Sequence, residues 1–101
     1  MELRMIESKT GRIFFEDKDG TRFNKVGYRW SSGFYDDGIA CVVRTKDGCK
    51  NYLRKDGTFI SSEWFIKGDD GFSSGFAKVM CSDGEWRYLD YEGNLYLNKP
   101  V

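Results

Sequence analysis

Short stretches of alternating hydrophobic and polar residues, separated by Asp-Gly pairs or close variants, make up most of the chain. The clearest stretches cover residues 40–42, 50–54, 58–60, 76–80, 85–90 and 94–97, and weaker ones cover residues 3–6, 12–16 and 21–23. Alternation with a period of two residues indicates β-strands with one face buried. Asp-Gly between such strands favours a hairpin, because a type I′ turn needs positive φ at both central residues. The pattern therefore predicts antiparallel hairpins and little or no helix.

The same landmarks recur with a period of about 37 residues. Asp56-Gly57 stands 37 positions after Asp19-Gly20, and Glu92-Gly93 follows 36 positions later. The segments at 38–42 and 75–79 keep this spacing. A period of this length indicates a repeat architecture. We predict one all-β domain, residues 1–101, made of three tandem β-hairpin or meander repeats over about residues 2–35, 36–72 and 73–101.

Apolar side chains recur at equivalent positions of the three copies. The predicted core columns are Leu3, Ala40 and Ala77; Met5, Val42 and Val79; Phe15, Tyr52 and Tyr88; and Phe23, Ile60 and Tyr96. A hairpin or meander of this size cannot bury such a face alone. Stacking the three units would bury it.

Charge, hydropathy and cysteine content indicate the compartment and the kinds of partner to expect. The chain has 16 basic and 16 acidic residues, interspersed, so no positive surface for nucleic acid is expected from composition. No apolar run is long enough to span a membrane, and the first residues do not resemble a signal peptide. The three cysteines form no Cys-x-x-Cys pair and are expected as free thiols. These features predict a cytoplasmic protein that binds neither nucleic acid nor membranes.

The sequence offers few candidates for catalysis. The chain has no histidine, which removes the commonest general base and metal ligand. Cys49 has Lys46 and Lys50 nearby, an arrangement that lowers a thiol pKa, although a turn position also explains this cysteine. The Asp36-Asp37 and Asp69-Asp70 pairs lack the spacing of a calcium loop. We expect no enzyme activity, no cofactor and no metal site.

Aromatic and apolar residues outside the predicted core are the best candidates for a binding surface. We expect one contact at the C-terminal strand edge around residues 95–97, because an open β-array exposes strand edges that pair with another chain. The aromatic connector residues form the alternative patch. The candidate interface residues are Trp30, Trp64, Phe65, Tyr91, Leu95, Tyr96 and Leu97.

The second and third copies resemble WG repeats, also called KWG-type repeats, of bacterial proteins. Residues 72–79, 83–90 and 92–95 carry the likeness in the third copy, and residues 37–42, 52–57 and 62–65 carry it in the second. Trp86 is followed by Arg87, and Lys50-Asn51 occupies the equivalent place, so a Lys/Trp-Asn variant is closest. The resemblance implies a β-rich array with a binding role, and no catalytic residue.

Two functions fit these observations. The first is a non-catalytic protein-binding module, such as a small inhibitor or adaptor of bacterial or phage origin, with possible self-association. The second is a carbohydrate- or cell-surface-binding module in which exposed Trp and Tyr rings stack on sugars. The second requires aromatic side chains side by side on one exposed strip.

Overall fold

The computed structural model describes residues 2–100, and in this range the only regular secondary structure is β-sheet. The strands are β1 (Arg4–Glu7), β2 (Ile13–Glu16), β3 (Trp30–Phe34), β4 (Ile39–Val43), β5 (Lys50–Arg54), β6 (Lys67–Gly68), β7 (Phe76–Met80), β8 (Trp86–Asp90) and β9 (Leu95–Tyr96). Every strand pairing is antiparallel. The predicted all-β, antiparallel fold class is therefore confirmed.

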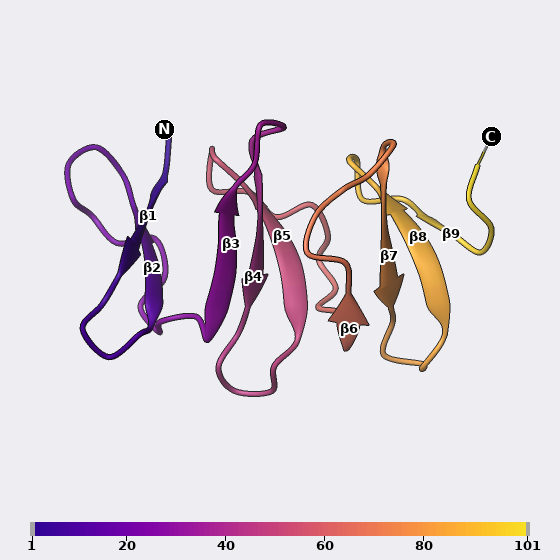
Figure 1. The fold of residues 1–101 in the computed structure, drawn as a ribbon, viewed down its shortest axis with the longest axis horizontal. Helices are drawn as coiled ribbons and strands as arrows, with labels where there is room; N and C mark the ends of the chain where they lie inside the picture. Colours follow the sequence, from indigo (N-terminus) through magenta and orange to yellow (C-terminus); the bar gives the residue numbers. More distant parts are fainter. Residues whose placement is uncertain (1, 101) are drawn as a thin grey trace.

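The strands form three sheets that follow one another along the longest axis of the molecule (Figure 1). We name them the N-terminal sheet (β1-β2), the central sheet (β3-β4-β5) and the C-terminal sheet (β6-β7-β8-β9). The molecule measures 41 × 26 × 18 Å, and its radius of gyration is 13.5 Å. That radius is close to the roughly 13 Å of a compact 100-residue domain.

Two hydrophobic cores fill the spaces between the sheets. The first packs side chains of the N-terminal sheet, such as Phe15, against Ala40, Val42 and Leu53 of the central sheet. The second packs the opposite face of the central sheet against the C-terminal sheet. All five residues of β4 are buried, because this strand has a sheet on each side. The central sheet is thus the middle layer of a stack.

The predicted hairpins form, but the turn type expected for Asp-Gly is wrong. At residues 17–21 the amide of Asp17 donates to the carbonyl of Thr21, and the amide of Gly20 donates to that of Asp17. Gly20 has a φ of 81°, while the only non-glycine residue with positive φ is Ser74 in the described chain. This is a three-residue loop that ends in a left-handed glycine, the bulged alternative to the two-residue turn. Only Ser74-Gly75 has positive φ at both central residues.

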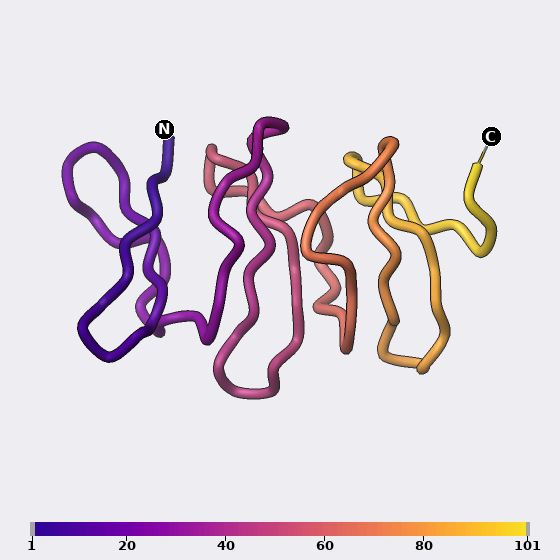
Figure 2. The backbone as a smooth tube through the Cα atoms, in the orientation of Figure 1, coloured from indigo at the N-terminus to yellow at the C-terminus, as the bar shows by residue number. Residues whose placement is uncertain are grey.

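Each connector joins two neighbouring sheets. Tyr28 exchanges two backbone hydrogen bonds with Ile13 of the N-terminal sheet, and β3 directly after it pairs with β4. Phe65 exchanges the same two bonds with Lys50, and β6 then pairs with β7. The backbone tube in Figure 2 shows both connectors crossing from one sheet to the next. Each connector is therefore fixed by main-chain hydrogen bonds to the sheet before it and to the sheet after it.

The predicted core column of Met5, Val42 and Val79 is displaced by one residue in the first copy. Met5 pairs with Phe15, whereas Cys41 pairs with the equivalent Tyr52, so Met5 corresponds to Cys41 and not to Val42. Met5 is 39% exposed, which contradicts its predicted core position. The cause is the length of the first turn. In the turn between β1 and β2 the amide of Ser8 donates to the carbonyl of Arg12, four residues on. In the turn between β4 and β5 the amide of Arg44 donates to the carbonyl of Cys49, five residues on, so this turn is one residue longer.

In the column of Phe15, Tyr52 and Tyr88, a side chain is fully buried only where the next sheet of the stack covers it. Phe15 and Tyr52 are completely buried, in agreement with the prediction. Phe34 packs edge-on against Phe15 at 5.4 Å between ring centroids, and Phe72 does the same to Tyr52 at 5.1 Å. Tyr88 is only half-buried, so its predicted core position is wrong. It lies on the C-terminal sheet, at the end of the described stack.

Alkaline pH is expected to destabilise the fold through its buried tyrosines. Burial raises the pKa of Tyr28 from 10.0 to about 12 and also raises the pKa of Tyr52. Between these pKa values the folded protein keeps a proton that the unfolded chain loses. This contribution to stability is therefore complete below about pH 10 and is lost as the pH rises toward 12.

Urea unfolding at about pH 8 and about pH 11 measures this loss. The fall in unfolding free energy should be smaller in Tyr28→Phe than in wild type. The exposed Tyr35→Phe serves as the control and should leave the fall unchanged. An equal pH dependence in wild type and Tyr28→Phe would contradict the assignment to Tyr28.

Candidate interaction surface

The structure places the predicted interface residues at different sites. Trp30 and Tyr91 are 41% and 38% exposed, and Leu97 is 70% exposed. Leu95 and Tyr96 form β9 at one edge of the C-terminal sheet and are half-buried. Trp30, in contrast, lies on β3 of the central sheet.

Phe65 is a core residue and not a contact residue. Its side chain is completely buried in the core between the central and C-terminal sheets. Its backbone pairs with Lys50, which directs the ring inward. The predicted role of Phe65 in an exposed patch is therefore wrong.

Trp64 is half-buried and already has several partners. Its ring centroid lies 5.3 Å from that of Phe59 and 6.4 Å from that of Tyr28. The guanidinium of Arg44 lies 4.6 Å from the ring centroid, at a distance typical of a cation–π contact. This indole therefore stabilises the connector, and only part of its surface remains for a partner.

The outer face of the C-terminal sheet is an aromatic surface of which the predicted interface residues include only Tyr96. Ala77, Val79 and Leu89 are fully buried against the central sheet. Because side chains alternate along a strand, their neighbours point away from that core. The cross-strand pairs on the outer face are Phe76 with Asp90, Lys78 with Tyr88, Met80 with Trp86, and Tyr88 with Tyr96. We call these seven residues the outer face.

The equivalent face of the central sheet shows what the outer face is suited to contact. There the cross-strand pairs are Ile39 with Arg54, Cys41 with Tyr52, and Val43 with Lys50. Ile39, Cys41 and Tyr52 are covered by the C-terminal sheet. In the described chain no further sheet lies beyond the C-terminal one, and Trp86 is 43% exposed. In the predicted repeat alignment, no later copy within these 101 residues covers the apolar columns of the third copy. This could have indicated the surface from the sequence.

The opposite end of the stack has a different chemistry. Arg4 pairs with Glu16 across the N-terminal sheet, at 2.8 Å between Nη2 and Oε1. In the central sheet the equivalent pair is Ala40 with Leu53, which packs into a core. Arg22 lies 4.0 Å from the ring centroid of Phe14. The N-terminal end is therefore protected by charged side chains, whereas the C-terminal end presents rings.

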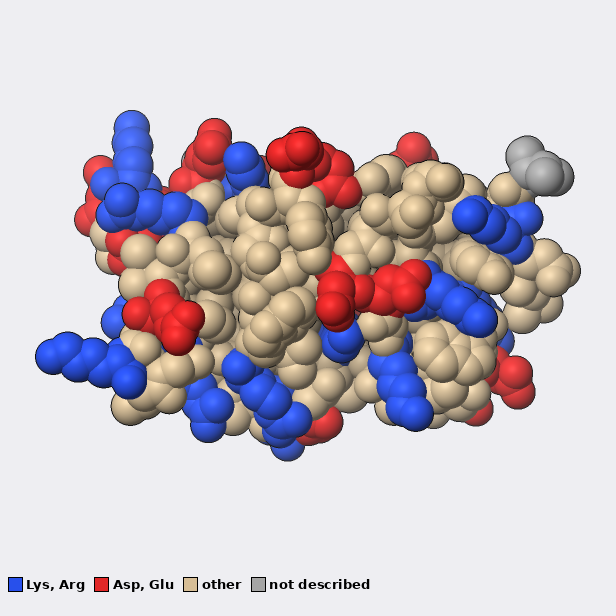
Figure 3. All heavy atoms as spheres, in the orientation of Figure 1, with Lys and Arg blue, Asp and Glu red and all other residues tan. Residues whose placement is uncertain are grey.

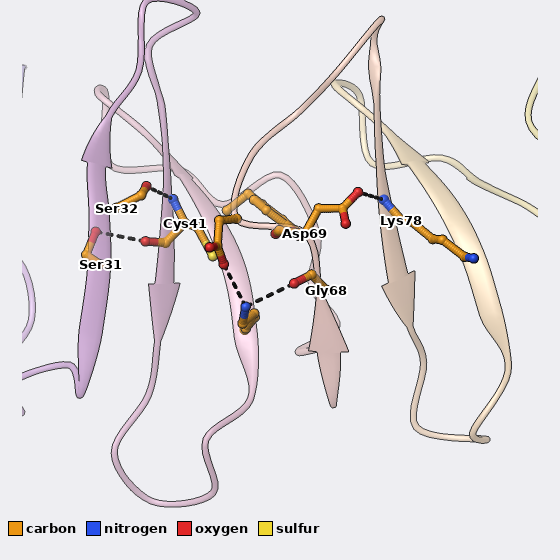
Figure 4. A network of polar contacts seen from close by, with 9 residues as sticks. Ser31, Ser32, Cys41, Gly68, Asp69 and Lys78 are labelled. Carbon is orange, nitrogen blue, oxygen red and sulfur yellow. Dashed lines mark hydrogen bonds and ion pairs between the residues drawn. The ribbon is translucent and has the colours of Figure 1, made fainter.

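Polar contacts hold the sheets in place behind the outer face (Figure 4). The hydroxyl of Ser31 donates to the carbonyl of Cys41, and the hydroxyl of Ser32 accepts from the amide of Cys41. These bonds compensate for the bulge between β3 and β4. Asp69 accepts a bond from the amide of Lys78 in β7. A carboxylate thereby fixes β7, which carries part of the outer face.

Burial raises the pKa of all three cysteines. All three are free, and burial raises the pKa of Cys41 to about 12. Burial, and then the neighbouring Asp47, also raise the pKa of Cys49, contrary to the lowering expected from Lys46 and Lys50. The ammonium of Lys50 binds the carbonyl of Gly68 and the carboxylate of Asp70 instead, both at 2.9 Å.

Comparison with protein-family models, with curated proteins and with solved structures finds no match to this chain. Within residues 2–100 no three Cys, Asp or Glu side chains are grouped so that they could hold a metal ion. The same residues contain no helix of the length and apolarity that crossing a membrane requires.

Proposed function

We propose that this chain is a three-unit β-repeat of the WG type and a non-catalytic protein-binding module. Support for the repeat comes from hydrogen bonds that recur at the sequence period. The Phe23-to-Phe15 bond has its counterpart 37 positions later, from Ile60 to Tyr52. The paired bonds of Tyr28 with Ile13 recur at the same interval. Each unit contacts only its neighbours in such a stack, and within the described chain one face of the C-terminal sheet has no neighbour.

The outer face is the observation that carries the binding proposal. Both internal sheet boundaries place aromatic rings against small aliphatic side chains, as Tyr52 does against Ala77 and Val79. The outer face offers the ring of Tyr88 at the position of Tyr52, with Phe76, Met80 and Trp86 around it. Exposed aromatic and methionine side chains are enriched at protein interfaces. The partner is a protein surface with small aliphatic residues.

A protein partner fits this face better than a sugar. Sugar stacking needs free, flat ring faces side by side. The ring of Phe76 stands at 87° to that of Tyr96, so the two do not form a platform. The ammonium of Lys78 lies 5.1 Å from the centroid of the Trp86 ring and covers part of it.

Head-to-tail stacking of two copies is disfavoured. The N-terminal sheet of a second copy would present Arg4 and Glu16 where the covering sheets present Ala77 and Leu89. Burying this ion pair against tyrosine rings would remove its solvation. We therefore expect the partner of the outer face to be a different protein. The purified chain should sediment as a monomer.

Substitution of Trp86 should weaken partner binding strongly. The wild type and the variants Trp86→Ala and Trp30→Ala are used to recover partners from the native cell, and affinities are then measured with the purified partner. Loss of a central aromatic contact costs about 2 kcal/mol or more, which is roughly a 30-fold loss of affinity. Trp30→Ala is the matched control, because its side chain is 41% exposed against 43% for Trp86 but lies on β3.

Two results would contradict the proposal. One is that Trp86→Ala retains the partner with wild-type affinity while remaining folded by circular dichroism. The other is that a neutral oligosaccharide shifts the amide resonances of the outer face, which would favour the carbohydrate-binding function.

A further inference from the structure

A hollow of about 540 Å³ opens where three turns meet, away from the outer face. Its walls are Phe34, Tyr35, Asp36, Asp37, Phe72 and Tyr91, with Gly71 at the base of one side. The first four belong to β3 and the β3–β4 turn, and Tyr91 belongs to the turn between β8 and β9. The hollow therefore exists only when the central and C-terminal sheets are stacked.

Aromatic rings form the two sides of the hollow. Tyr91 stacks on Phe72 with 4.4 Å between ring centroids and an interplanar angle of 18°. The ring of Tyr35 lies directly over Gly71, where an added Cβ would stand 2.9 Å from Cε2 of Tyr35. Tyr35 is nevertheless 46% exposed. Glycine at position 71 thus lets an accessible ring lie against the backbone.

Negative charge is placed beside these rings. The hydroxyl of Tyr91 donates to Oδ2 of Asp37 at 2.8 Å. Neither Asp36 nor Asp37 takes part in the ion pairs found within residues 2–100. Figure 3 shows acidic side chains gathered at the upper edge of the molecule, over the β3–β4 turn. The bond from Tyr91 fixes the Asp37 carboxylate at the edge of the hollow.

The nearest basic side chains do not neutralise the hollow. No Lys or Arg is among its lining residues. The guanidinium of Arg54 is held by the carbonyls of Phe59 and Tyr91, both at 3.0 Å. Lys55 pairs with Glu2 at 3.7 Å. The ammonium of Lys55 also lies 5.8 Å from the centroid of the Phe34 ring, and Oδ1 of Asp37 accepts a hydrogen bond from the amide of Ile39 at 3.0 Å. Neither Asp36 nor Asp37 has an ion-pair partner within residues 2–100, so a cation from outside can still pair with them.

We propose that this hollow binds a cationic side chain, an arginine or lysine presented by a peptide. The guanidinium or ammonium group would lie against the Tyr35 ring and beside the Asp36 and Asp37 carboxylates. Aromatic faces attract such cations through the ring quadrupole. A carboxylate next to the ring adds a charge-assisted hydrogen bond. The site goes beyond the function proposed for the outer face and does not depend on it.

The observations favour a cation over a neutral sugar. One face of the Tyr91 ring is occupied by Phe72, so the stack does not offer two free rings as a sugar platform. The two unneutralised carboxylates select by charge, which a sugar hydroxyl does not exploit. A cation with a flat apolar surface uses the ring and the charge together.

Titration of the 15N-labelled protein with N-acetyl-arginine amide tests the site directly. We expect saturable shifts of the amide resonances of Tyr35, Gly38, Phe72 and Tyr91. The citrulline analogue has nearly the same shape without the charge and should bind at least about fivefold more weakly. Binding should also weaken as salt is added.

Variants separate the two contributions. Asp36→Asn/Asp37→Asn removes the charge and keeps the shape, and Tyr35→Leu removes the ring. Each should weaken arginine binding by roughly fivefold or more, with the dispersed spectrum of a folded protein. Glu85→Gln removes one charge from a turn of the C-terminal sheet and should bind as the wild type does. The Trp86→Ala variant of the outer face should also bind normally.

Three results would overturn the proposal: no shifts in these residues, equal binding of arginine and citrulline amides, or shifts caused by chitotriose but not by arginine amide. Wild-type affinity in folded Asp36→Asn/Asp37→Asn would do the same.

Discussion

Replacement of Tyr52 by alanine is expected to lower the free energy of unfolding by about 3–5 kcal/mol, because truncating a buried aromatic side chain leaves a large cavity. Tyr52 is completely buried between the central and C-terminal sheets. Its hydroxyl also donates to the carbonyl of Asp69. Such a loss is a large fraction of the roughly 5–15 kcal/mol by which native proteins are stable. Urea denaturation followed by circular dichroism measures it.

Tyr88→Ala is the matched control for this prediction. Tyr88 occupies the equivalent strand position but is half-buried on the outer face. Its truncation should cost less than about 2 kcal/mol, since less apolar area leaves water on folding. Equal losses for Tyr52→Ala and Tyr88→Ala would mean that the outer face is a buried surface in the free protein.

Substitution of Gly93 by alanine is the second large effect. Gly93 has a φ of 90°, and an added Cβ would lie 2.5 Å from the carbonyl oxygen of Ile60. The left-handed conformation costs roughly 1–2 kcal/mol for a residue with a Cβ. The clash with backbone adds roughly 1–3 kcal/mol, because the backbone at Ile60 cannot rotate away as a side chain would. Gly93→Ala should therefore lose about 2–5 kcal/mol in urea denaturation.

Gly84→Ala isolates the contribution of the backbone angle. Gly84 has a φ of 83°, and an added Cβ would meet nothing within 4 Å. This variant should lose only about 1–2 kcal/mol. If Gly84→Ala and Gly93→Ala are equally destabilised, the contact between the β8–β9 turn and Ile60 does not hold the two sheets together.

The comparison of Tyr52 with Tyr88 illustrates a limit of sequence reasoning. Both are tyrosines in alternating strands, and nothing in their local sequence distinguishes them. Burial depends on whether another layer covers the strand, and that is a property of the stack. Trp64 and Phe65 show the same limit at adjacent positions, because the bridge of Phe65 to Lys50 decides which ring turns inward.

The hairpin turns show what local sequence leaves open. Asp-Gly is compatible with a two-residue turn and with a three-residue loop that ends in glycine. The longer loop forms at residues 17–21 and again at 54–58 and 90–94. Side-chain oxygens support it, as Asp17 Oδ1 accepts from the amides of Asp19 and Thr21. The glycine was therefore predictable, and the turn type was not.

The hollow lined by Tyr35, Asp37 and Tyr91 could not be predicted from the sequence. Tyr91 and Asp37 are 54 positions apart and lie in turns of different sheets. Neither residue belongs to a motif with a known spacing. Their hydrogen bond depends on the angle at which the C-terminal sheet stacks on the central sheet.

The sequence by itself determined the antiparallel all-β class, the positions of seven of the described strands and the glycines at the turns, because alternation and left-handed φ are properties of a few consecutive residues. Strands β3 and β6 lie in segments expected as connectors, and the predicted strands at 21–23 and 58–60 form only isolated bridges. The tertiary structure decided the register of the first hairpin, the burial of Tyr88 and Phe65, and the meeting of Tyr35, Asp37 and Tyr91. These features depend on how one sheet covers the next, and the contacts that set this stacking join residues far apart in the chain.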